Sequence, residues 1–599
     1  MSLQLVEQYV RLCTGCPALE PGTRVEISLA QVADILCCTL RNATLTLKKM
    51  QNLGWLMWQP GRGRGHLSSL TCFIGPSDLV FSTAKELVQR GEIHASRQLI
   101  GDYQNRWPGL EDSYARWMSS QFGLSRGAKG TRGGDRVDTL RLFVDRPFGS
   151  LDPVSVLLRS QTHLVKQIFD TLVRFDPVTR TIEPQLAFSW DVDEAGRQWI
   201  FYLRKGVLFH HGLPLTAEDV CFSLRRLMDK PSLHRWLLRT VEDVRPLDDY
   251  TVAVMLKHPD DLLLHALSKE YAAIVPRGYS QEMGESFPAL PVGSGPFKVV
   301  RNDDSMLVLE AFQSHFAGRP FLDRVELWCV PGLADETAKK QVQLLENDGR
   351  AQIAQQRRHP DWHGLSRREQ CFQYVSLNGR KPGVLQQPAF RQALASLLDG
   401  SEMRADLQGS RHPVEGWGDA GLIAVAAEAV AVNVGMVAKE CGYTGEPLRM
   451  YTYPDPDHEE DALWIQKRCA ASGIVVEIVY AKPEDLAKPE LLQRADLVLD
   501  SANVDEREEL SLLELVFAET LSIYHHLDEA GRSMIAELAA KERQAAMNGI
   551  LTVLRERNVL VPLYSNRIER EVHPRLCGLS LDSYGWIDYS RVFVRFQEM

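Results

Sequence analysis

The sequence predicts an α/β protein that begins with a small winged helix-turn-helix domain and continues into a much larger domain of mixed strands and helices. Three observations lead to this prediction: an order of helix, break, helix and hairpin near the N-terminus, a local excess of basic residues there, and a later β-meander followed by a helix. With 599 residues, 44% of them hydrophobic and 24% charged, the composition is that of a globular protein of several units. Collagen-like, coiled-coil and wholly disordered chains are therefore excluded.

The charge of the chain is distributed unevenly. The whole chain has 68 Lys and Arg against 78 Asp and Glu, which gives a net charge of −10. Residues 1–75 contain seven basic and four acidic residues, so this segment carries +3 and the remainder carries −13. A chain of this kind is not expected to coat nucleic acid along its whole surface, but its small basic segment can still bind nucleic acid.

Two helices separated by a short break are predicted between residues 28 and 54. Ser28 is placed to cap the first helix and Thr39 to cap the second, which Gly54 ends. On the second helix, small and apolar residues recur at spacings of three and four, which predicts a stripe that faces the core. Polar and basic residues recur at the same spacing on its opposite side.

A β-hairpin is predicted after the second helix. The segment GWLMWQ predicts a strand, residues 61–65 (GRGRG) a glycine-rich basic turn, and LSSLTCF a returning strand. This order is that of a winged helix, whose second helix enters the major groove of DNA while the wing contacts the backbone or minor groove. The alternative is that the basic residues of the second helix form an ordinary solvated face. The residues predicted to contact DNA are Thr39, Arg41, Asn42, Thr44, Lys48, Lys49, Arg62 and Arg64.

The next segments connect this domain to the rest of the chain. Residues 76–123 are polar with helical spacing of the apolar positions, which predicts a helical connector. Residues 124–137 are rich in glycine and basic residues, which predicts a flexible linker. The chain is therefore divided into a winged helix at 1–75, a connector at 76–123, a linker at 124–137 and a large domain at 138–599.

The N-terminus and the cysteines favour a cytoplasmic protein without a membrane span. The start MSLQLVEQYVRLCTG lacks the apolar run of a secretory signal, and the most apolar stretch, 421–438, is interrupted by Glu428 and Asn433. The 11 cysteines are an odd number and scattered, as expected of reduced thiols. Cys13 and Cys16 form a C-x-x-C, which leaves metal or redox sensing as an alternative. We expect no bound metal and no cofactor.

The large domain carries an ordered set of motifs. They are SLDP at 150–153, a strand-rich block at 184–229, PVGSGPFK at 291–298, AGRPFLD at 317–323, YVSLNG at 374–379 followed by FRQA at 390–393, and a closing run from 561 to 594. In this order the motifs resemble the family 5 extracellular solute-binding proteins, the oligopeptide, dipeptide and nickel receptors of ABC importers. The resemblance implies a two-lobed, periplasmic-binding-protein-like fold (type II, family 5), with lobe 1 at about 138–370 plus 556–599 and lobe 2 at about 371–555.

A winged helix ahead of such a domain resembles the SgrR family of transcription regulators. TLRN at 39–42, GWL at 54–56, GRGR at 61–64 and LSLLEL at 510–515 also look like that family. The resemblance implies a cytoplasmic, ligand-responsive transcription regulator whose partners are double-stranded DNA and a small-molecule or peptide effector, such as a sugar phosphate or an oligopeptide. The oligomeric state stays open. The alternative is a solute-binding receptor of an ABC importer for peptides or nickel.

Residues near the crossover between the two implied lobes are the candidate ligand contacts. The segment 374–380 is extended chain there and can offer backbone and amide groups to a ligand. In peptide-binding members of the family, an acidic residue in a Gly/Trp/Asp-rich segment holds the peptide amino terminus, and the corresponding region here is 496–505 without that motif. For Asn378 the alternative is a purely structural role in the hinge. The candidate ligand residues are Tyr374, Asn378, Gly379, Arg380 and Asp500.

No catalytic signature is found in the sequence. H-E-x-x-H and a phosphate-binding loop are missing, because the glycines at 61–65 are followed by a strand pattern and not by a helix. GLSRG at 123–127 has the spacing G-x-S-x-G, but it stands at the start of the glycine-rich linker pattern and not in the strand-to-helix turn of a catalytic serine. We therefore expect that the protein is not an enzyme and has no catalytic residues.

Overall fold

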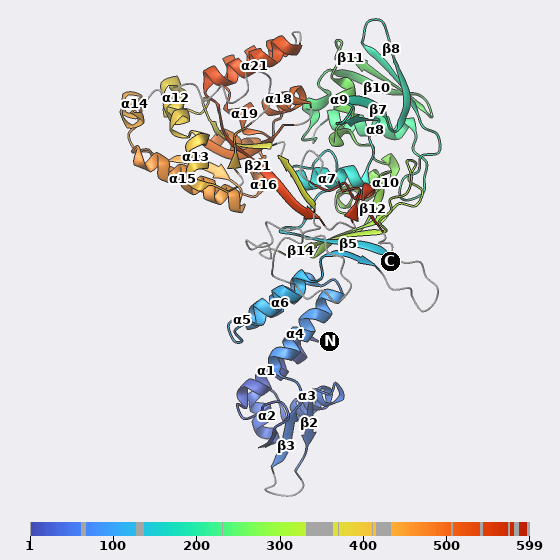
Figure 1. Cartoon of the computed structure of the whole chain (residues 1–599), viewed down its shortest axis with the longest axis vertical. Helices are drawn as coiled ribbons and strands as arrows, with labels where there is room; N and C mark the ends of the chain where they lie inside the picture. The colour runs from blue at the N-terminus through green and yellow to red at the C-terminus, as the bar shows by residue number, and fades with distance from the viewer. Residues whose placement is uncertain are drawn as a thin grey trace.

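The computed structural model describes most of the chain and has an elongated shape. A small head and a helical neck lead into a broad body of two lobes (Figure 1). The described residues are 2–61, 67–126, 137–229, 232–330, 363–368, 371–409, 411–414, 433–504, 507–539, 543–572, 576–579 and 586–595.

The head has the element order of a winged helix. Its strands form one antiparallel sheet in the order β1-β3-β2. Ser28 and Gln31 form a capping box at the start of α2, and the Thr39 hydroxyl accepts a hydrogen bond from the Asn42 N–H at the start of α3. Gly54 follows α3 at φ +73°, a conformation that glycine adopts without strain. The elements are α1 (Leu3–Gly15), β1 (Arg24–Ile27), α2 (Leu29–Ile35), α3 (Leu40–Asn52), β2 (Leu56–Gln59) and β3 (Ser68–Cys72).

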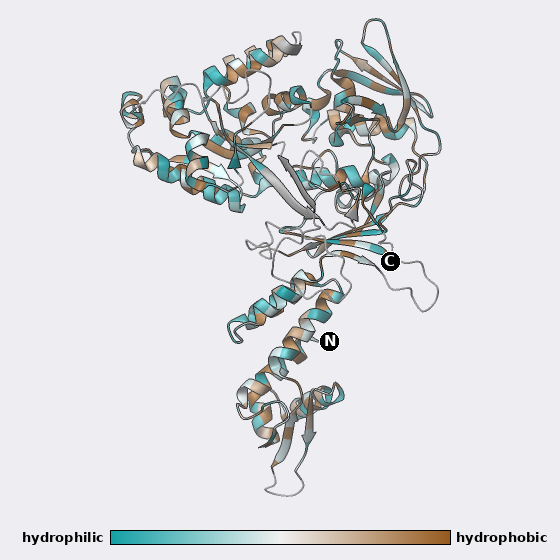
Figure 2. Ribbon diagram, viewed as in Figure 1, coloured by the Kyte–Doolittle hydropathy of each residue, from teal (hydrophilic) through white to brown (hydrophobic). Residues whose placement is uncertain are grey.

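Three helices form the neck between the head and the body. They are α4 (Pro76–Gln89), α5 (Ile93–Gln104) and α6 (Leu110–Ser119), which lie within the segment expected to be a helical connector. Both hydrophilic and hydrophobic residues run along α4 and α5 in Figure 2, as expected of helices with one buried face. Their buried side chains belong to the same hydrophobic cluster as those of α1, α2 and α3. Head and neck therefore share one core.

That cluster continues into the body, and we call it the junction cluster. It includes Met306, Val308, Trp328 and Val330 on strands β13 (Met306–Ala311) and β14 (Arg324–Cys329) and at the end of β14. The ring of Phe122 lies 5.6 Å from that of Trp328, centroid to centroid. The neck is thereby packed onto lobe 1, and the head is joined to the body through the core that it shares with the neck.

The start of the expected linker is part of the body. Residues Gly123–Arg126 form strand β4, which pairs antiparallel with β5 (Asp138–Val144) at the edge of a five-stranded sheet of order β12-β13-β14-β5-β4. Leu124 is only 1% exposed, because this strand position faces the core. Residues 124–126 of the predicted linker 124–137 are thus strand, and residues 127–136 lie outside the described residues.

Lobe 1 contains this sheet and an added subdomain. A four-stranded sheet, β10-β11-β9-β8, packs against α8, whose start is the capping box of Thr216 and Asp219. The elements of this lobe are α7 (Arg159–Ile168), β6 (Val173–Asp176), β7 (Thr181–Pro184), β8 (Ala187–Val192), β9 (Gln198–Leu203), α8 (Ala217–Met228), the 3-10 helix η1 (Arg235–Leu238), β10 (Val241–Asp248), β11 (Thr251–Leu256), α9 (Leu263–Leu267), α10 (Arg277–Met283) and β12 (Phe297–Asn302), together with short strands β22 (Leu576–Cys577) and β23 (Phe593–Val594).

Lobe 2 is built on a seven-stranded mixed sheet. Its strands are β15 (His363–Arg368), β16 (Cys371–Leu377), β17 (Arg411–His412), β18 (Leu448–Thr452), β19 (Val476–Tyr480), β20 (Leu497–Asn503) and β21 (Leu560–Val572). Every residue of β16 is buried, since the sheet is covered on both faces. The helices are α12 (Pro388–Leu397), α13 (Gly400–Leu407), α14 (Val434–Glu440), α15 (Pro456–Ala471), α16 (Pro483–Leu486), α17 (Pro489–Arg494), α18 (Glu508–Phe517), α19 (Ser522–His526), α20 (Glu529–Leu538) and α21 (Arg543–Arg557).

The return of the chain to lobe 1 comes later than expected. The predicted boundary at residue 556 would place β21 in lobe 1, but its first residues pair antiparallel with β16 in the lobe 2 sheet. The reason is that Val561, Leu563 and Tyr564 are buried in the lobe 2 core.

Among the described residues, no helix has the length and apolarity needed to cross a bilayer. Most of the apolar stretch 421–438 lies outside the described residues. Its last part forms the start of α14, where the Asn433 side chain accepts a hydrogen bond from the Met436 N–H.

Candidate nucleic-acid interface and ligand cleft

Helix α3 presents its polar and basic side chains to solvent. Ala43, Leu47 and Met50 are buried at 0–1% exposure, as the sequence pattern predicts. The opposite face is exposed, and among the described residues none of its basic side chains takes part in an ion pair. The exposed residues that the sequence nominated for DNA contact are Thr39, Arg41, Asn42, Thr44, Lys48 and Lys49.

Two details qualify this face. The Thr44 hydroxyl donates to the Leu40 carbonyl (2.9 Å), so it is left as an acceptor for any outside partner. Leu40 and Leu45, which are half exposed, lie among the charged residues. The wing strands β2 and β3 pair as predicted, whereas Arg62 and Arg64 lie outside the described residues.

In the head, the Cys13 thiol contacts that of Cys72, which lies outside the C-x-x-C motif. Cys13 Sγ lies 3.8 Å from Cys72 Sγ, with both side chains in the core beside Tyr9. Among the described residues, no group of three or more His, Cys, Asp and Glu is arranged to hold a metal ion.

A partly open cavity, which we call the chamber, lies between the two lobes. Its volume is about 130 Å³. Lobe 1 contributes Leu157, Leu158, Arg159, His234 and Tyr271, whereas lobe 2 contributes Tyr453, residues 500–503 and part of α18. Since both lobes form its wall, the chamber is the candidate ligand cleft.

Burial shifts the pKa values of several ionisable side chains in the chamber. Burial raises the pKa of the Asp500 carboxyl to about 7, and it raises the pKa of Glu514 on α18 to about 7. Asp500 accepts a hydrogen bond from the N–H of Ser501 (2.8 Å), its immediate neighbour on β20. Burial also lowers the pKa of His234 to about 4, and that imidazole stacks on Tyr271 with 3.6 Å between ring centroids. The chamber wall therefore combines two carboxyl groups that are partly protonated near neutral pH with the guanidinium of Arg159.

Only one of the five nominated ligand residues lines the chamber. Asp500 does so, from strand β20. Tyr374 on β16 is fully buried, and its hydroxyl lies 3.2 Å from that of Ser522, so it packs between the sheet and α19.

The other three nominated residues organise the turn after β16. The Asn378 amide donates to the Ala495 carbonyl (2.8 Å), and its oxygen accepts from the N–H groups of Arg380 and Lys381 (3.0 Å each). Gly379 donates to the His526 carbonyl, and Arg380 lies 3.8 Å from Glu529. The structural alternative for Asn378 is the one that these contacts favour.

Sequence reasoning missed most of the chamber. Arg159, Tyr271, Tyr453 and Glu514 come from four distant segments, and none belongs to a motif that points to a ligand. Besides the nominated Asp500, the lining residues Ser501, Ala502 and Asn503 lie within the region 496–505 that the family resemblance singles out, so these three had a usable signal.

Comparison with known proteins extends over the whole chain. The family profile described as "Sugar transport-related sRNA regulator N-term" matches residues 4–122, and that of "Bacterial extracellular solute-binding proteins, family 5 Middle" matches residues 181–518. An uncharacterized protein of Bacillus subtilis, YhjP, is 36% identical over 99% of this chain and 100% of its own length.

Two further proteins illustrate the separate parts. The HTH-type transcriptional regulator SgrR of Yersinia enterocolitica is 34% identical over 58% of each chain, so the match spans less than two thirds of that regulator. The periplasmic binding protein DppA of Helicobacter pylori, solved with the peptide STSA, matches with a TM-score of 0.63 at 20% identity over 76% of this chain and 98% of its own. The predicted fold class is confirmed, and the chain belongs to the family 5 solute-binding proteins, with an N-terminal part that matches the family model of the sugar transport-related regulators and is similar to SgrR.

Proposed function

We propose that the protein is a cytoplasmic, non-catalytic transcription regulator that binds double-stranded DNA through its head and a small solute or peptide in its interlobe chamber. The observation that carries the proposal is the exposed basic face of α3 on a winged helix. Its side chains Arg41, Lys48 and Lys49 are free of ion pairs among the described residues and are therefore available to phosphates and base edges. Arg62 and Arg64 on the wing add phosphate contacts in this proposal.

The packing of the head supports a particular route for the ligand signal. The junction cluster joins head, neck and lobe 1, so these parts move as one body. The α4–α5 loop reinforces the joint, because the Gly91 carbonyl accepts a hydrogen bond from the Arg301 guanidinium (2.9 Å). Ligand in the chamber then changes the position of lobe 2 relative to that body. For this to regulate, the ligand must favour one arrangement of the lobes over the other.

The effector itself is left broad in this proposal: a small organic molecule, such as a sugar phosphate, or an oligopeptide. The alternative function, a receptor that delivers solute to an importer, draws on the fold shared with DppA. It gives no role to the basic face of α3, and for that reason we favour the regulator.

The experiment that tests the proposal measures DNA affinity of the full chain against salt. The probe is a duplex selected from random-sequence DNA by the wild-type protein, and the variant is Arg41→Ala with Lys48→Ala. Loss of two phosphate or base contacts should weaken binding about 10- to 1,000-fold and lower the slope of log affinity against log salt by about 2.

The matched control is Arg90→Ala. Arg90 is exposed on the neck and pairs only weakly with Glu86 (3.8 Å), so this change also removes a positive charge from the same part of the chain. The control should bind the duplex like wild type. Equal gel-shift affinity and salt slope for the double variant and the wild type would reject the DNA-binding assignment.

A further inference from the structure

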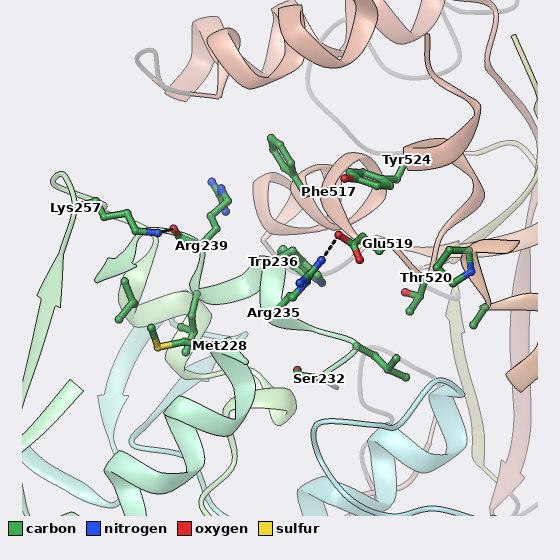
Figure 3. Close-up of a pocket in the computed structure, with 15 residues that line it drawn as sticks. Met228, Ser232, Arg235, Trp236, Arg239, Lys257, Phe517, Glu519, Thr520 and Tyr524 are labelled. Carbon is green, nitrogen blue, oxygen red and sulfur yellow. Dashed lines mark hydrogen bonds and ion pairs between the residues drawn. The ribbon is translucent and has the colours of Figure 1, made fainter. Parts of the chain in front are cut away.

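A second, wider cavity lies beside the chamber, and we call it the vestibule. Its volume is about 510 Å³, and it shares Ala487 and Thr520 with the chamber wall. Figure 3 shows its two sides: Arg239 and Lys257 come from the lobe 1 subdomain, while Phe517 and Tyr524 come from lobe 2. The two cavities are therefore neighbouring parts of the space between the lobes.

The vestibule has a surplus of positive charge. Its lining holds three cations, Arg235, Arg239 and Lys257, against one carboxylate, Glu519. Arg235 forms an ion pair with Glu519 across the cavity, which neutralises both (Figure 3). The Lys257 ammonium donates to the Arg239 carbonyl oxygen (2.8 Å), a neutral acceptor, and so keeps its charge uncompensated there.

Arg239 is the central cation of this surface. Its guanidinium lies 5.3 Å from the ring centroid of Phe517 in the facing lobe. No carboxylate among the described residues forms an ion pair with it, and burial lowers its pKa, opposed by the charge of Asp260. Asp260 is engaged by the Thr240 hydroxyl (2.7 Å). A partly buried guanidinium of this kind is well suited to bind an oxyanion.

Aromatic walls lie beside these cations. The Trp236 side chain is only 5% exposed, and its indole N–H has no hydrogen-bond partner among the described residues. Its nitrogen atom is itself buried, so the indole contributes a wall of the vestibule and not a donor that a ligand can reach. The rings of Phe517 and Tyr524 supply an apolar surface that can pack against the carbon skeleton of a ligand.

We propose that the vestibule binds the anionic end of an organic effector, a phosphate ester or a carboxylate, through Arg239 and Lys257. This inference deepens the proposed function, since it concerns the same ligand. The effector is expected to place its anionic end in the vestibule, where the cations lie, and its other end towards the chamber. Because the walls of the vestibule belong to both lobes, a bound anion holds the lobes together.

The test is isothermal titration of the full chain with three small probes of one shape. Phenyl phosphate and benzoate represent the two anion sources, and benzyl alcohol is the neutral analogue, all at the same ionic strength. We expect saturable binding of at least one anion and about tenfold or greater preference over the alcohol, as a charge-assisted hydrogen bond would give. The stronger of the two anions identifies the source.

The variant Arg239→Gln should weaken anion binding about tenfold, while Arg239→Lys should retain the preference for anions over the alcohol. The matched control is Arg449→Gln, which removes an exposed guanidinium of lobe 2 that pairs with Glu477 and does not line the vestibule. Thermal unfolding of each variant shows whether it is folded, and Arg239→Lys covers the case in which Arg239→Gln is not.

Two outcomes would overturn the proposal: no saturable binding of either anion up to about 10 mM, or equal binding by wild type and Arg239→Gln. Neither outcome depends on DNA. If the protein binds its DNA duplex but neither anion, the anion site is rejected and the proposed DNA-binding function stands. If it binds an anion but no DNA duplex, the anion site stands and the DNA-binding function is rejected.

Discussion

The contact between the N-terminal part and lobe 1 and the contact between the two lobes are made by different kinds of side chain. The joint between neck and lobe 1 is closed by aliphatic and aromatic side chains that form one cluster, with Phe122 packed between Phe143 and Trp328. The joint between the lobes also has apolar contacts, but it encloses two cavities lined with charged groups and is crossed by ion pairs such as Arg146–Asp455 and Arg235–Glu519. A joint closed by buried apolar side chains is expected to stay closed, whereas one lined by charged groups and cavities is suited to open and respond to a ligand.

The largest expected effect comes from weakening the joint between the neck and lobe 1 with Phe122→Ala. The Phe122 side chain is 9% exposed, and its removal from a packed aromatic group should cost about 3–5 kcal/mol. The loss should appear as a lower unfolding temperature and as faster proteolysis of the neck. Phe188→Ala is the control, because Phe188 is 64% exposed on the subdomain. Wild-type stability of Phe122→Ala would show that the junction cluster does not hold the head.

The next effect is the pH dependence of folding stability that the Asp500 carboxyl group causes. Because burial raises the pKa of Asp500 to about 7, well above the value near 3.9 of an unfolded chain, the folded state binds this proton more tightly. Its contribution to stability is therefore full below about pH 4 and is lost as the pH rises to about 7.

Asp500→Asn should remove this penalty. The variant should be more stable than wild type by about 1–3 kcal/mol at pH 8, with the difference vanishing near pH 4. Denaturant unfolding at several pH values measures it, and Asp485→Asn on the surface of lobe 2 is the control that should show no such gain. A gain in stability that does not depend on pH would mean that the buried charge of Asp500 is not its cause.

The smallest expected effect concerns an ion pair between the two lobes. Arg146 lies 3.0 Å from Asp455 across the lobes, with both side chains partly exposed, so the pair should contribute about 0.2–1 kcal/mol to closure. Arg146 is the better partner to remove, because the Asp455 side chain also caps α15.

Small-angle scattering of Arg146→Ala at low salt should show a modest shift towards open lobes. High salt should bring wild type closer to the variant, since screening weakens the ion pair. Arg449→Ala, which breaks the Arg449–Glu477 pair within lobe 2, should leave the scattering unchanged. Identical curves for Arg146→Ala and wild type at low salt would contradict a role for this ion pair in closure.

Local sequence patterns were sufficient for the head but not for the cleft. Helix caps at Ser28 and Thr39 and the buried stripe of α3 depend on residues a few positions apart, which a sequence displays directly. The chamber depends on Arg159, Tyr453 and Glu514, which only the long-range pairing of strands and lobes brings together. Tyr374 and Asn378 were nominated because they lie at the crossover. Their contacts show that such positions can serve the backbone of the hinge instead.

The antiparallel pairing of β4 with β5 has a consequence for chain connectivity. Arg126 is the partner of Asp138 in the register, so the chain leaves this sheet and returns to it at neighbouring positions. The covalent link through residues 127–136 is then dispensable for holding the head in place, because β4 and the junction cluster already do so. Residues 1–126 and 137–599, produced as two separate polypeptides in one cell, should reassociate into a single particle with the architecture of the intact protein.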